Sequence, residues 1–367
     1  MALDSLLNSP RKLTRGLLDS HLVESLLTPN PVERYVGMID PVWSRRDVRA
    51  KVVAVERQTP RSVTLTLEPN SNWNGFEPGQ HVGVTVEIDG RLTTRFYSPA
   101  GAAAGKGLEL TITRHPGGKV SEHLADIAAP GMVVGLSPAE GEFTLPSTRP
   151  DHLLLISGGS GITPVMSMLR TLCAEGHDRP VTFLHFARTP QDAIYARELQ
   201  ALGEAHANLN VVTVFTREGT KPQHLTRATL KSICPDYLAA ETYVCGPNAL
   251  VDAAEKLWKR DRNADRLHTE PFTLPEPTVV AADATGSVTF KRSGIAVEND
   301  GQSLLLQAEQ GNLSPRHGCR MGICHTCVCR VESGTVRHVR TGEVKTLNNE
   351  LVQICVNAPV GDIEIDL

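Results

Sequence analysis

The sequence predicts a multidomain protein: a helical N-terminal arm, an antiparallel β-barrel, an α/β domain with a parallel sheet, and a small α+β domain of the β-grasp type. Three observations lead to this prediction. The chain has 367 residues, enough for two or three domains. Short strands of alternating polarity give way, near residue 150, to continuous apolar strands followed by helices. Five of the eight cysteines lie within the last 50 residues, which sets the end of the chain apart.

Composition excludes several classes of protein. Hydrophobic residues make up 40% of the chain and charged residues 21%, and the net charge of −4 gives no bulk basis for nucleic-acid binding. No apolar run reaches the ~18 residues of a transmembrane helix, and no export signal is recognisable at the N-terminus. Eight cysteines could form four disulfides in a secreted protein, but four of them have the spacing of metal ligands. This favours a reducing compartment. We therefore expect a cytoplasmic protein, with a peripheral position at the inner membrane face as the alternative.

Residues 1–45 are predicted to form short amphipathic helices, because apolar residues recur at roughly helical spacing and prolines divide the segment. We expect a helical arm that packs on the body of the protein. The alternative is a surface that contacts a membrane or a membrane-bound partner. The apolar positions are Leu3, Leu6, Leu7, Leu13, Leu17, Leu18, Leu22, Val23, Leu26 and Leu27.

Residues 46–147 are predicted to form the β-barrel, because short β-branched segments alternate with turn residues at regular spacing. One segment, Thr94-Arg95-Phe96-Tyr97-Ser98-Pro99, carries unusual chemistry for a strand. Arg95 offers a planar, permanently charged fork that suits a phosphate. The predicted strands cover residues 52–55, 62–67, 81–86 and 108–113.

The R-x-Y-S pattern of this segment resembles the flavin motif of the ferredoxin-NADP reductase superfamily. The resemblance implies that Arg95, Phe96, Tyr97 and Ser98 bind a flavin. Arg95 then contacts the flavin phosphates, Tyr97 lies flat against the ring system or its ribityl chain, and the Ser98 hydroxyl lies near flavin N5, as a catalytic residue. An exposed strand arginine and a core tyrosine are the alternative interpretation.

A glycine-containing turn after the next strand supports the flavin prediction. Backbone N–H groups freed by glycines, followed by a helix N-terminus, form a phosphate site. We expect a helix to begin near Glu122. In the resembling family this segment holds the flavin phosphates, and its G-K-V-S form favours FAD, with FMN as the alternative. The residues concerned are Gly118, Lys119, Val120 and Ser121.

Residues 148–273 are predicted to form the α/β domain. The apolar run at residues 153–157 reads as a strand buried on both faces, and it leads through a glycine-rich turn into a helix. Further parallel strands are predicted at residues 181–186, 209–215 and 242–245. The turn, G-G-S-G-I-T-P, resembles the nicotinamide-nucleotide motif of the same superfamily, which implies binding roles for Gly159, Gly161, Thr163 and Pro164.

The last of these strands ends in Cys245-Gly246-Pro247, which resembles the family's C-G-P motif. The resemblance implies that all three residues bind the nucleotide and that Cys245 acts catalytically beside nicotinamide C4. A small buried hydrophobic residue is the alternative for Cys245.

The choice between NADPH and NADH depends on cations near the 2′-phosphate. Arg188 lies just past one predicted strand, and Thr216-Arg217 just past the next. Thr216-Arg217 resembles the element that holds this phosphate in NADPH-using relatives, so we expect NADPH. NADH stays open, because NADH-using relatives also carry an arginine at the position of Arg188.

Three prolines between His268 and Pro277 indicate a stiff linker, with residues 274–283 as its core, and residues 284–367 then form the β-grasp domain. We expect a hairpin around Ser293-Gly294 and a helix over residues 302–309.

Cysteines in this last domain follow the C-x4-C-x2-C pattern with a distant fourth cysteine, the ligand spacing of a plant-type [2Fe-2S] cluster. We read Cys329 as structural. A zinc site is the alternative, but zinc sites usually pair two short knuckles. Arg316, Arg320 and Arg330 near this loop suggest a negatively charged docking partner. The predicted ligands are Cys319, Cys324, Cys327 and Cys355, the last of them expected on a late strand over residues 351–355.

Together these motifs predict an NAD(P)H:acceptor oxidoreductase that passes electrons through a flavin and the cluster to a partner protein. The three-part order resembles oxygenase and desaturase reductases, and the long N-terminal arm looks closest to reductases of bacterial acyl-CoA (stearoyl-CoA) desaturases. That resemblance implies a membrane-bound diiron desaturase as partner. The alternatives are the reductase of a Rieske or diiron oxygenase and, from another class, a redox-sensing regulatory module.

Overall fold

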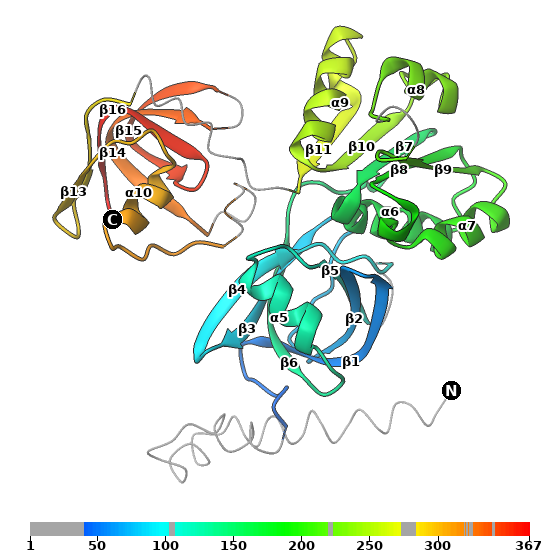
Figure 1. Cartoon of the computed structure of the whole chain (residues 1–367), viewed down its shortest axis with the longest axis horizontal. Coiled ribbons are helices and arrows are strands. Elements are labelled where there is room, and N and C mark those ends of the chain that lie inside the picture. Colours follow the sequence, from blue (N-terminus) through cyan, green and yellow to red (C-terminus); the bar gives the residue numbers. More distant parts are fainter. Residues whose placement is uncertain are drawn as a thin grey trace.

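The computed structural model describes residues 40–102, 107–218, 223–272, 284–318, 320, 322, 326–339 and 342–367. They form three separate sheets, each with its own helices (Figure 1). Most of the predicted N-terminal arm and the linker core at residues 274–283 lie outside these ranges, and the domain boundaries stay predictions. Within the described ranges, no helix is long and apolar enough to cross a membrane.

The first sheet is antiparallel, in the order β4-β3-β6-β1-β2-β5. It is closed into a barrel where Pro99, just after β4, bridges Leu110 of β5, and the Ala100 N–H donates to the Glu109 carbonyl at 2.9 Å. This confirms the predicted antiparallel flavin-type domain. Its strands are β1 (Val48–Thr59), β2 (Ser62–Pro69), β3 (His81–Ile88), β4 (Arg91–Tyr97), β5 (Leu108–Thr113) and β6 (Val133–Glu140).

Helix α5 (Lys119–Ile127) packs on the barrel through Val120 and Leu124, which are fully buried. The helix begins three residues earlier than predicted. Gly118 is its N-cap, so Lys119, Val120 and Ser121 form the first turn instead of preceding it. Glycine is an accepted N-cap residue, which allows the helix to begin directly after Gly118.

The second sheet is parallel, in the order β11-β10-β7-β8-β9, as predicted for the α/β domain. Side chains of α6 and α7 pack on one face, and side chains of α8 and α9 pack on the other. Burial on both faces explains the continuous apolar run of β7. The elements are β7 (Leu153–Gly158), α6 (Ile162–Ala174), β8 (Val181–Ala187), α7 (Ala196–Ala205), β9 (Leu209–Phe215), α8 (Arg227–Ile233), β10 (Glu241–Gly246), α9 (Asn248–Arg260) and β11 (Leu267–Pro271).

The predicted linker begins too early, because β11 occupies its first residues. β11 pairs with β10 in parallel register, from Thr242 opposite Leu267 to Gly246 opposite Pro271. Proline is tolerated there because β11 is an edge strand and Pro271 is its last residue. This error matters for the site, since Glu270 lies on this strand.

The third sheet is mixed, in the order β13-β12-β16-β14-β15, with α10 packed against it, which confirms the β-grasp prediction. The predicted hairpin is present, with Phe290 opposite Ile295. Cys355, predicted on a strand, instead lies in the turn between β15 and β16. The elements are β12 (Ser287–Phe290), β13 (Ile295–Glu298), α10 (Leu304–Gln310), β14 (Val328–His338), β15 (Val344–Gln353) and β16 (Asn357–Ile365).

Arg170 of α6 holds the barrel and the parallel sheet together. Its Nη1 donates to the Ala100 carbonyl at 2.8 Å and to Glu109 Oε1 of β5 at 2.6 Å, while Nε and Nη2 donate to both carboxylate oxygens of Glu198 on α7 at 2.7 and 2.6 Å. The guanidinium also lies 4.8 Å from the ring centroid of Tyr195. Although burial opposes the charge, these two carboxylates raise the pKa of Arg170 above its usual range. One side chain thus joins two domains.

We predict that Arg170→Met lowers the free energy of unfolding by about 3 kcal/mol, because it leaves two partly buried carboxylates without their cation. Urea titration followed by tryptophan fluorescence measures this. The control is Arg149→Met, which breaks a bidentate pair with Glu175 inside one domain at a more exposed site; we expect a loss below about 1 kcal/mol. Equal losses in the two variants would contradict the role of Arg170 in joining the two domains.

Candidate active site

Strand β4 carries the predicted flavin motif on the barrel. Arg95 is half-buried, and its Nη1 donates to the Thr94 carbonyl at 2.8 Å. Burial and the nearby positive charge of Arg320 lower the pKa of Arg95. A phosphate bound at this guanidinium would offset both the burial and the repulsion from Arg320, because its negative charge stabilises the charged form of Arg95. Burial raises the pKa of Tyr97 well above its usual range, so its phenol stays neutral.

Several buried polar atoms gather here without a hydrogen-bond partner among the described residues. They are Ser98 Oγ, both ring nitrogens of His81, and Glu270 Oε2. Ser98 is 1% exposed, and His81 and Glu270 are 4% and 5% exposed. Buried polar groups are normally satisfied, so these atoms are a fit for the polar edge of a bound group. A flavin offers such an edge.

His81 and Glu270 were not among the predicted site residues. His81 Nδ1 lies 3.6 Å from Glu270 Oε1, and the His81 ring meets Phe96 edge-on with a centroid distance of 5.5 Å. Glu270 lies opposite Cys245 in the β10–β11 register. Phe96, His81, Glu270 and Cys245 therefore form a continuous contact from the flavin motif on the barrel to the C-G-P motif on the parallel sheet.

Glu270 has an unusual electrostatic setting. Burial raises the pKa of its carboxyl, and His81 opposes that shift. The carboxyl thus holds a proton to higher pH than an exposed glutamate does. The sequence offered one weak signal, an acid one residue before the proline that ends β11, and the proline-rich context hid it.

The predicted phosphate turn lies at the start of α5. The Ser121 hydroxyl accepts from the His115 N–H at 3.2 Å and donates to the Gly118 carbonyl at 3.2 Å. A Cβ on Gly118 would lie 2.4 Å from the Ser121 hydroxyl, so a larger residue would displace that hydroxyl from its hydrogen bonds. Lys119 is exposed and Val120 anchors the helix in the core. The turn thus presents a compact helix N-terminus, a ready anion site.

The glycine-rich turn after β7 lies against the end of β10. A Cβ on Gly161 would come within 2.6 Å of the Cys245 and Gly246 backbones, and Gly159 has a φ of +53°. Thr163 is fully buried, and its hydroxyl donates to the Ser160 carbonyl at 3.3 Å. Pro164 lies in the first turn of α6, where a missing N–H does no harm. Glycine is therefore required by the close approach of two strand ends.

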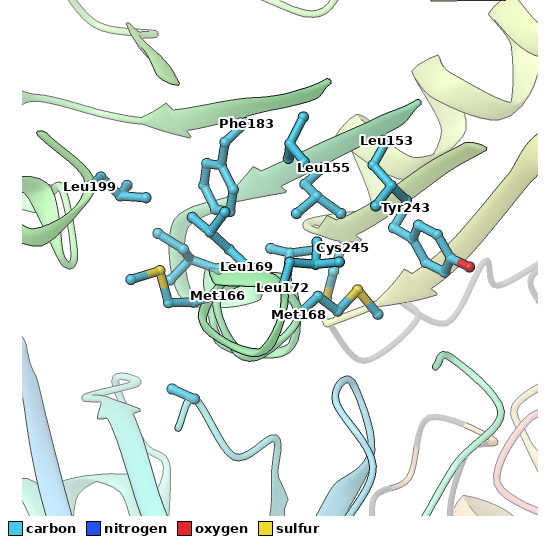
Figure 2. Close-up of a cluster of buried hydrophobic side chains, with 14 of the residues drawn as sticks. Leu153, Leu155, Met166, Met168, Leu169, Leu172, Phe183, Leu199, Tyr243 and Cys245 are labelled. Atoms are coloured by element: carbon cyan, nitrogen blue, oxygen red, sulfur yellow. The ribbon is translucent and has the colours of Figure 1, made fainter. Parts of the chain in front are cut away.

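Cys245 is fully buried at the carboxyl end of β10. Figure 2 shows it among apolar side chains of the sheet and of α6, including Leu155, Met168 and Leu172. Burial, and then the nearby Glu270, raise the pKa of the Cys245 thiol well above its usual range. The neutral thiol suits an apolar wall of the site and not a nucleophile.

A cleft of about 490 Å³ runs between the barrel and the parallel sheet. Barrel residues such as Arg61 and His115 line one side of it. The other side combines Gly158, Gly159, Ser160, Arg188, Thr216, Pro247 and Phe272.

The two predicted phosphate-selecting segments lie next to each other at the edge of this cleft. The Thr216 N–H donates to the Ala187 carbonyl at 2.8 Å, and the Arg217 N–H donates to the Arg188 carbonyl at 3.0 Å. Arg188 and Arg217 are both exposed. Cations at the carboxyl ends of two neighbouring parallel strands are well placed for a nucleotide phosphate.

Two of the four predicted cluster ligands lie within the described residues. Cys327 and Cys355 are 2% and 6% exposed, and both pack in the core of the third sheet. The Ile354 N–H donates to the Cys327 carbonyl at 3.2 Å, which holds the two thiols' backbones side by side. Cys319 and Cys324 lie outside the described residues. Cysteines that are held together from two segments suit an iron–sulfur cluster.

The docking hypothesis for the arginines needs a correction at Arg320. Its guanidinium makes a bidentate ion pair with Glu309 of α10, at 2.9 Å through Nη1, and lies 2.8 Å from His317 Nε2. Arg330 Nη1 donates to the Asn349 carbonyl at 3.1 Å. Arg320 is therefore committed within the domain and is a poor docking charge for a partner.

We predict that Cys329→Ser keeps the visible absorption of the cluster, whereas Cys327→Ser loses it. Cys329 is half-buried, and burial and Cys327 raise the pKa of its thiol, as does Asp366 at the chain end. Cys329 thus lies within strand β14 as a neutral thiol, which fits a structural residue and not a cluster ligand. Absorption spectra and iron content of the two purified variants measure this, and loss of the cluster in Cys329→Ser alone would refute the ligand assignment.

Three known domain families match this chain, in the same order as the three domains described above. The sequence matches the oxidoreductase FAD-binding domain over residues 51–145, the oxidoreductase NAD-binding domain over residues 155–256, and the 2Fe-2S iron-sulfur cluster binding domain over residues 288–359. Among solved structures, phthalate dioxygenase reductase superposes with a TM-score of 0.63 at 24% identity, covering 87% of this chain and 97% of that one, and it shares the fold.

Two curated relatives extend the match to most of the chain. An NADPH oxidoreductase of Mycobacterium tuberculosis is 35% identical over 348 residues, covering 93% of this chain and 90% of the relative. The glycine betaine monooxygenase reductase subunit of Pseudomonas aeruginosa is 30% identical, covering 79% and 87%. The chain therefore belongs to the ferredoxin reductase type of NAD(P)H oxidoreductases, in which an FAD-binding domain, an NAD-binding domain and a [2Fe-2S] domain follow one another.

Proposed function

We propose that this protein is the reductase component of an oxygenase system, which delivers electrons from NADPH, by way of FAD and the [2Fe-2S] cluster, to a separate terminal oxygenase. One observation carries the electron-entry part: the contact through His81 and Glu270 joins the flavin motif of the barrel to Cys245 of the parallel sheet. Relatives that name a partner support the oxygenase part, since they are a glycine betaine monooxygenase reductase subunit and a propane 2-monooxygenase reductase component.

In this proposal the barrel binds the flavin. Arg95 and the N-terminus of α5, at Gly118, Lys119, Val120 and Ser121, hold its phosphates. Phe96 and Tyr97 would supply flat contacts, and the buried Ser98 hydroxyl would gain a hydrogen-bond partner from the bound group. Bound FAD supplies the exchange between two-electron hydride chemistry and one-electron chemistry.

The parallel sheet orients the nicotinamide nucleotide in this proposal. Gly159 and Gly161 let its pyrophosphate approach the backbone, while Thr163 and Pro164 fix the first turn of α6. Cys245, Gly246 and Pro247 form the wall beside the nicotinamide, and the neutral Cys245 thiol excludes water there. Glu270 Oε2 can hold a proton next to that wall.

NADPH is the proposed donor because two arginine-bearing segments meet at the rim of the cleft. Arg188 and Arg217 are exposed, joined through their backbones, and lie beside Thr216, which lines the cleft. A 2′-phosphate needs such cations, whereas a 2′-hydroxyl favours a carboxylate.

The desaturase partner expected from the N-terminal arm receives less support than the oxygenase partner. That expectation rested on residues 1–45, of which residues 1–39 lie outside the described part of the chain. The relatives reported above that name a partner name monooxygenases. We keep the cytoplasm as the proposed compartment, since cluster thiols require reducing conditions.

We predict that Arg217→Gln raises the KM for NADPH roughly tenfold or more while leaving the KM for NADH nearly unchanged. A hydrogen bond to a charged group contributes about 1.5–3 kcal/mol, and only NADPH carries the extra phosphate. Steady-state ferricyanide reduction measures both constants. Arg179→Gln is the control, because this exposed arginine lies just before β8, at the opposite end of the sheet. Equal effects on both nucleotides would count against the assignment.

The proposed function itself is tested by reconstitution. The purified holoprotein is combined with Rieske or diiron oxygenase components, and in parallel with membranes that contain an acyl-CoA desaturase, and NADPH oxidation is followed with product formation. We expect coupled turnover with an oxygenase, and its loss in Cys327→Ser, which retains NADPH–ferricyanide activity through the flavin. Coupled turnover with the desaturase alone would overturn the oxygenase proposal. A protein that neither NADPH nor NADH reduces would overturn the reductase function.

A further inference from the structure

Three side chains of different ligand types converge at the amino end of the parallel sheet. They are His152, which precedes β7, Cys234, the C-cap of α8, and Asp236 two residues later. One ligand atom from each lies within 4.8 Å of the other two. This cluster takes no part in the site described above. The cluster and that site lie at opposite ends of β7, whose six residues span about 17 Å from end to end.

The separations between ligand atoms are close to those around a zinc ion. Cys234 Sγ lies 3.8 Å from His152 Nε2 and 3.7 Å from Asp236 Oδ1, whereas Asp236 Oδ2 lies 3.3 Å from the other ring nitrogen, His152 Nδ1. An ion binds only one nitrogen of an imidazole, so the set that a zinc ion can use is Cys234 Sγ, His152 Nε2 and one oxygen of Asp236. Bond lengths of about 2.3 Å to sulfur and 2.0–2.2 Å to nitrogen or oxygen place tetrahedral ligands roughly 3.3–3.6 Å apart. The Asp236 side chain is 68% exposed, and its rotation away from Nδ1 toward Sγ and Nε2 brings one ligand atom of each residue to one ion.

The backbone fixes two of these ligands in one short segment. The Cys234 N–H donates to the Leu230 carbonyl at 2.7 Å and ends α8, the Tyr237 N–H donates to the Cys234 carbonyl at 3.1 Å, and the Ala239 N–H donates to the Asp236 carbonyl at 2.8 Å. His152 is held because its carbonyl accepts from the Glu241 N–H at 2.9 Å. The cluster is thus formed by ordered turns at strand and helix ends.

A nucleophile, base and acid arrangement is the competing interpretation of cysteine, histidine and aspartate. Two observations speak against it. Cys234 is only 2% exposed, and burial and then Asp236 raise the pKa of its thiol to about 11, whereas a nucleophilic cysteine is accessible and easily ionised. Asp236 Oδ1 also lies 3.7 Å from the Cys234 thiol, whereas the acid of a nucleophile–base–acid relay contacts the imidazole and not the nucleophile.

We propose that His152, Cys234 and Asp236 form a binding site for Zn²⁺, with a water molecule as the fourth ligand. Sulfur, imidazole nitrogen and carboxylate oxygen together suit zinc better than magnesium or calcium, which prefer oxygen alone. The exposed Asp236 opens the site to solvent, so the ion enters without unfolding. The thiol proton passes to solvent when the sulfur coordinates as thiolate.

Such an ion would tie the end of α8 to the start of β7. The segment from Thr216 to α8 contributes Thr216, His224 and Leu225 to the cofactor cleft. Zinc would therefore stabilise the nucleotide-binding domain from the edge opposite the cleft, since a ligand that binds the folded state alone stabilises it. The reacting groups lie elsewhere, so turnover is not expected to require the ion.

The test is calorimetric titration of the full-length holoprotein, dialysed against EDTA, with ZnCl₂. We expect one tight site in the wild type, absent in Cys234→Ser and weakened more than about tenfold in Asp236→Asn, since even indirect ligand partners contribute 10–100-fold to metal affinity. Two matched controls should leave the affinity unchanged: Cys173→Ser, a half-buried cysteine near the end of α6, and Asp151→Asn, an exposed carboxylate beside His152.

Two further measurements distinguish binding at this site from binding at the iron–sulfur cluster. The visible absorption of the cluster must stay constant during the titration, so that zinc does not simply replace iron. ¹¹³Cd NMR of the same protein should show one resonance of mixed sulfur, nitrogen and oxygen coordination, absent in Cys234→Ser. Asp236→Asn alters an exposed side chain, and circular dichroism checks its fold. Zinc affinity that is the same in the wild type and both ligand variants, or a cadmium resonance from thiolates alone, would overturn the proposal.

Discussion

The relative position of the first two domains depends on the charges that Arg170 gathers. Its guanidinium is 16% exposed and bonds to Glu109 of the barrel and Glu198 of the parallel sheet, with the Ala100 carbonyl as a third acceptor. Nearby, the Ser167 hydroxyl donates to the Gly101 carbonyl at 2.8 Å, and the Tyr195 hydroxyl bonds with Thr111. A partly buried cation between two carboxylates persists only if both domains hold their places.

With the domains fixed in this way, two cofactor motifs face each other across one cleft. The side-chain-free backbone of Gly161 allows the turn after β7 to lie against the end of β10, and the His81–Glu270 pair fills the junction with the barrel. Buried polar atoms without partners cluster at this junction, in accord with a site shaped for a flavin. The chemistry of hydride transfer needs placement more than acid–base groups, and the fold supplies placement.

Local motifs carried most of what the sequence could predict. β5 and β9 have the predicted bounds, and the R-x-Y-S and G-G-S-G segments lie at the end of a strand and on the turn after a strand because their spacing is short. The missed features depend on partners remote in sequence. Arg170 pairs with Glu109 and Glu198, which lie 61 and 28 positions away in the sequence. Glu270 is recognisable as a site residue only from its contact with His81 of another domain. Prolines hid β11, since edge position is a property of the sheet and not of the segment.

In the proposed function, electrons from the nicotinamide nucleotide reach the cluster inside one chain, by way of the flavin. The most direct test of this path is anaerobic rapid mixing of the holoprotein with NADPH, followed by optical absorption and by electron paramagnetic resonance of samples frozen at successive times. We expect bleaching of the flavin first and the signal of a reduced [2Fe-2S] cluster afterwards, with no cluster signal in flavin-free protein. Cluster reduction at the same rate without flavin, or no cluster reduction in the holoprotein, would contradict an electron path through the flavin.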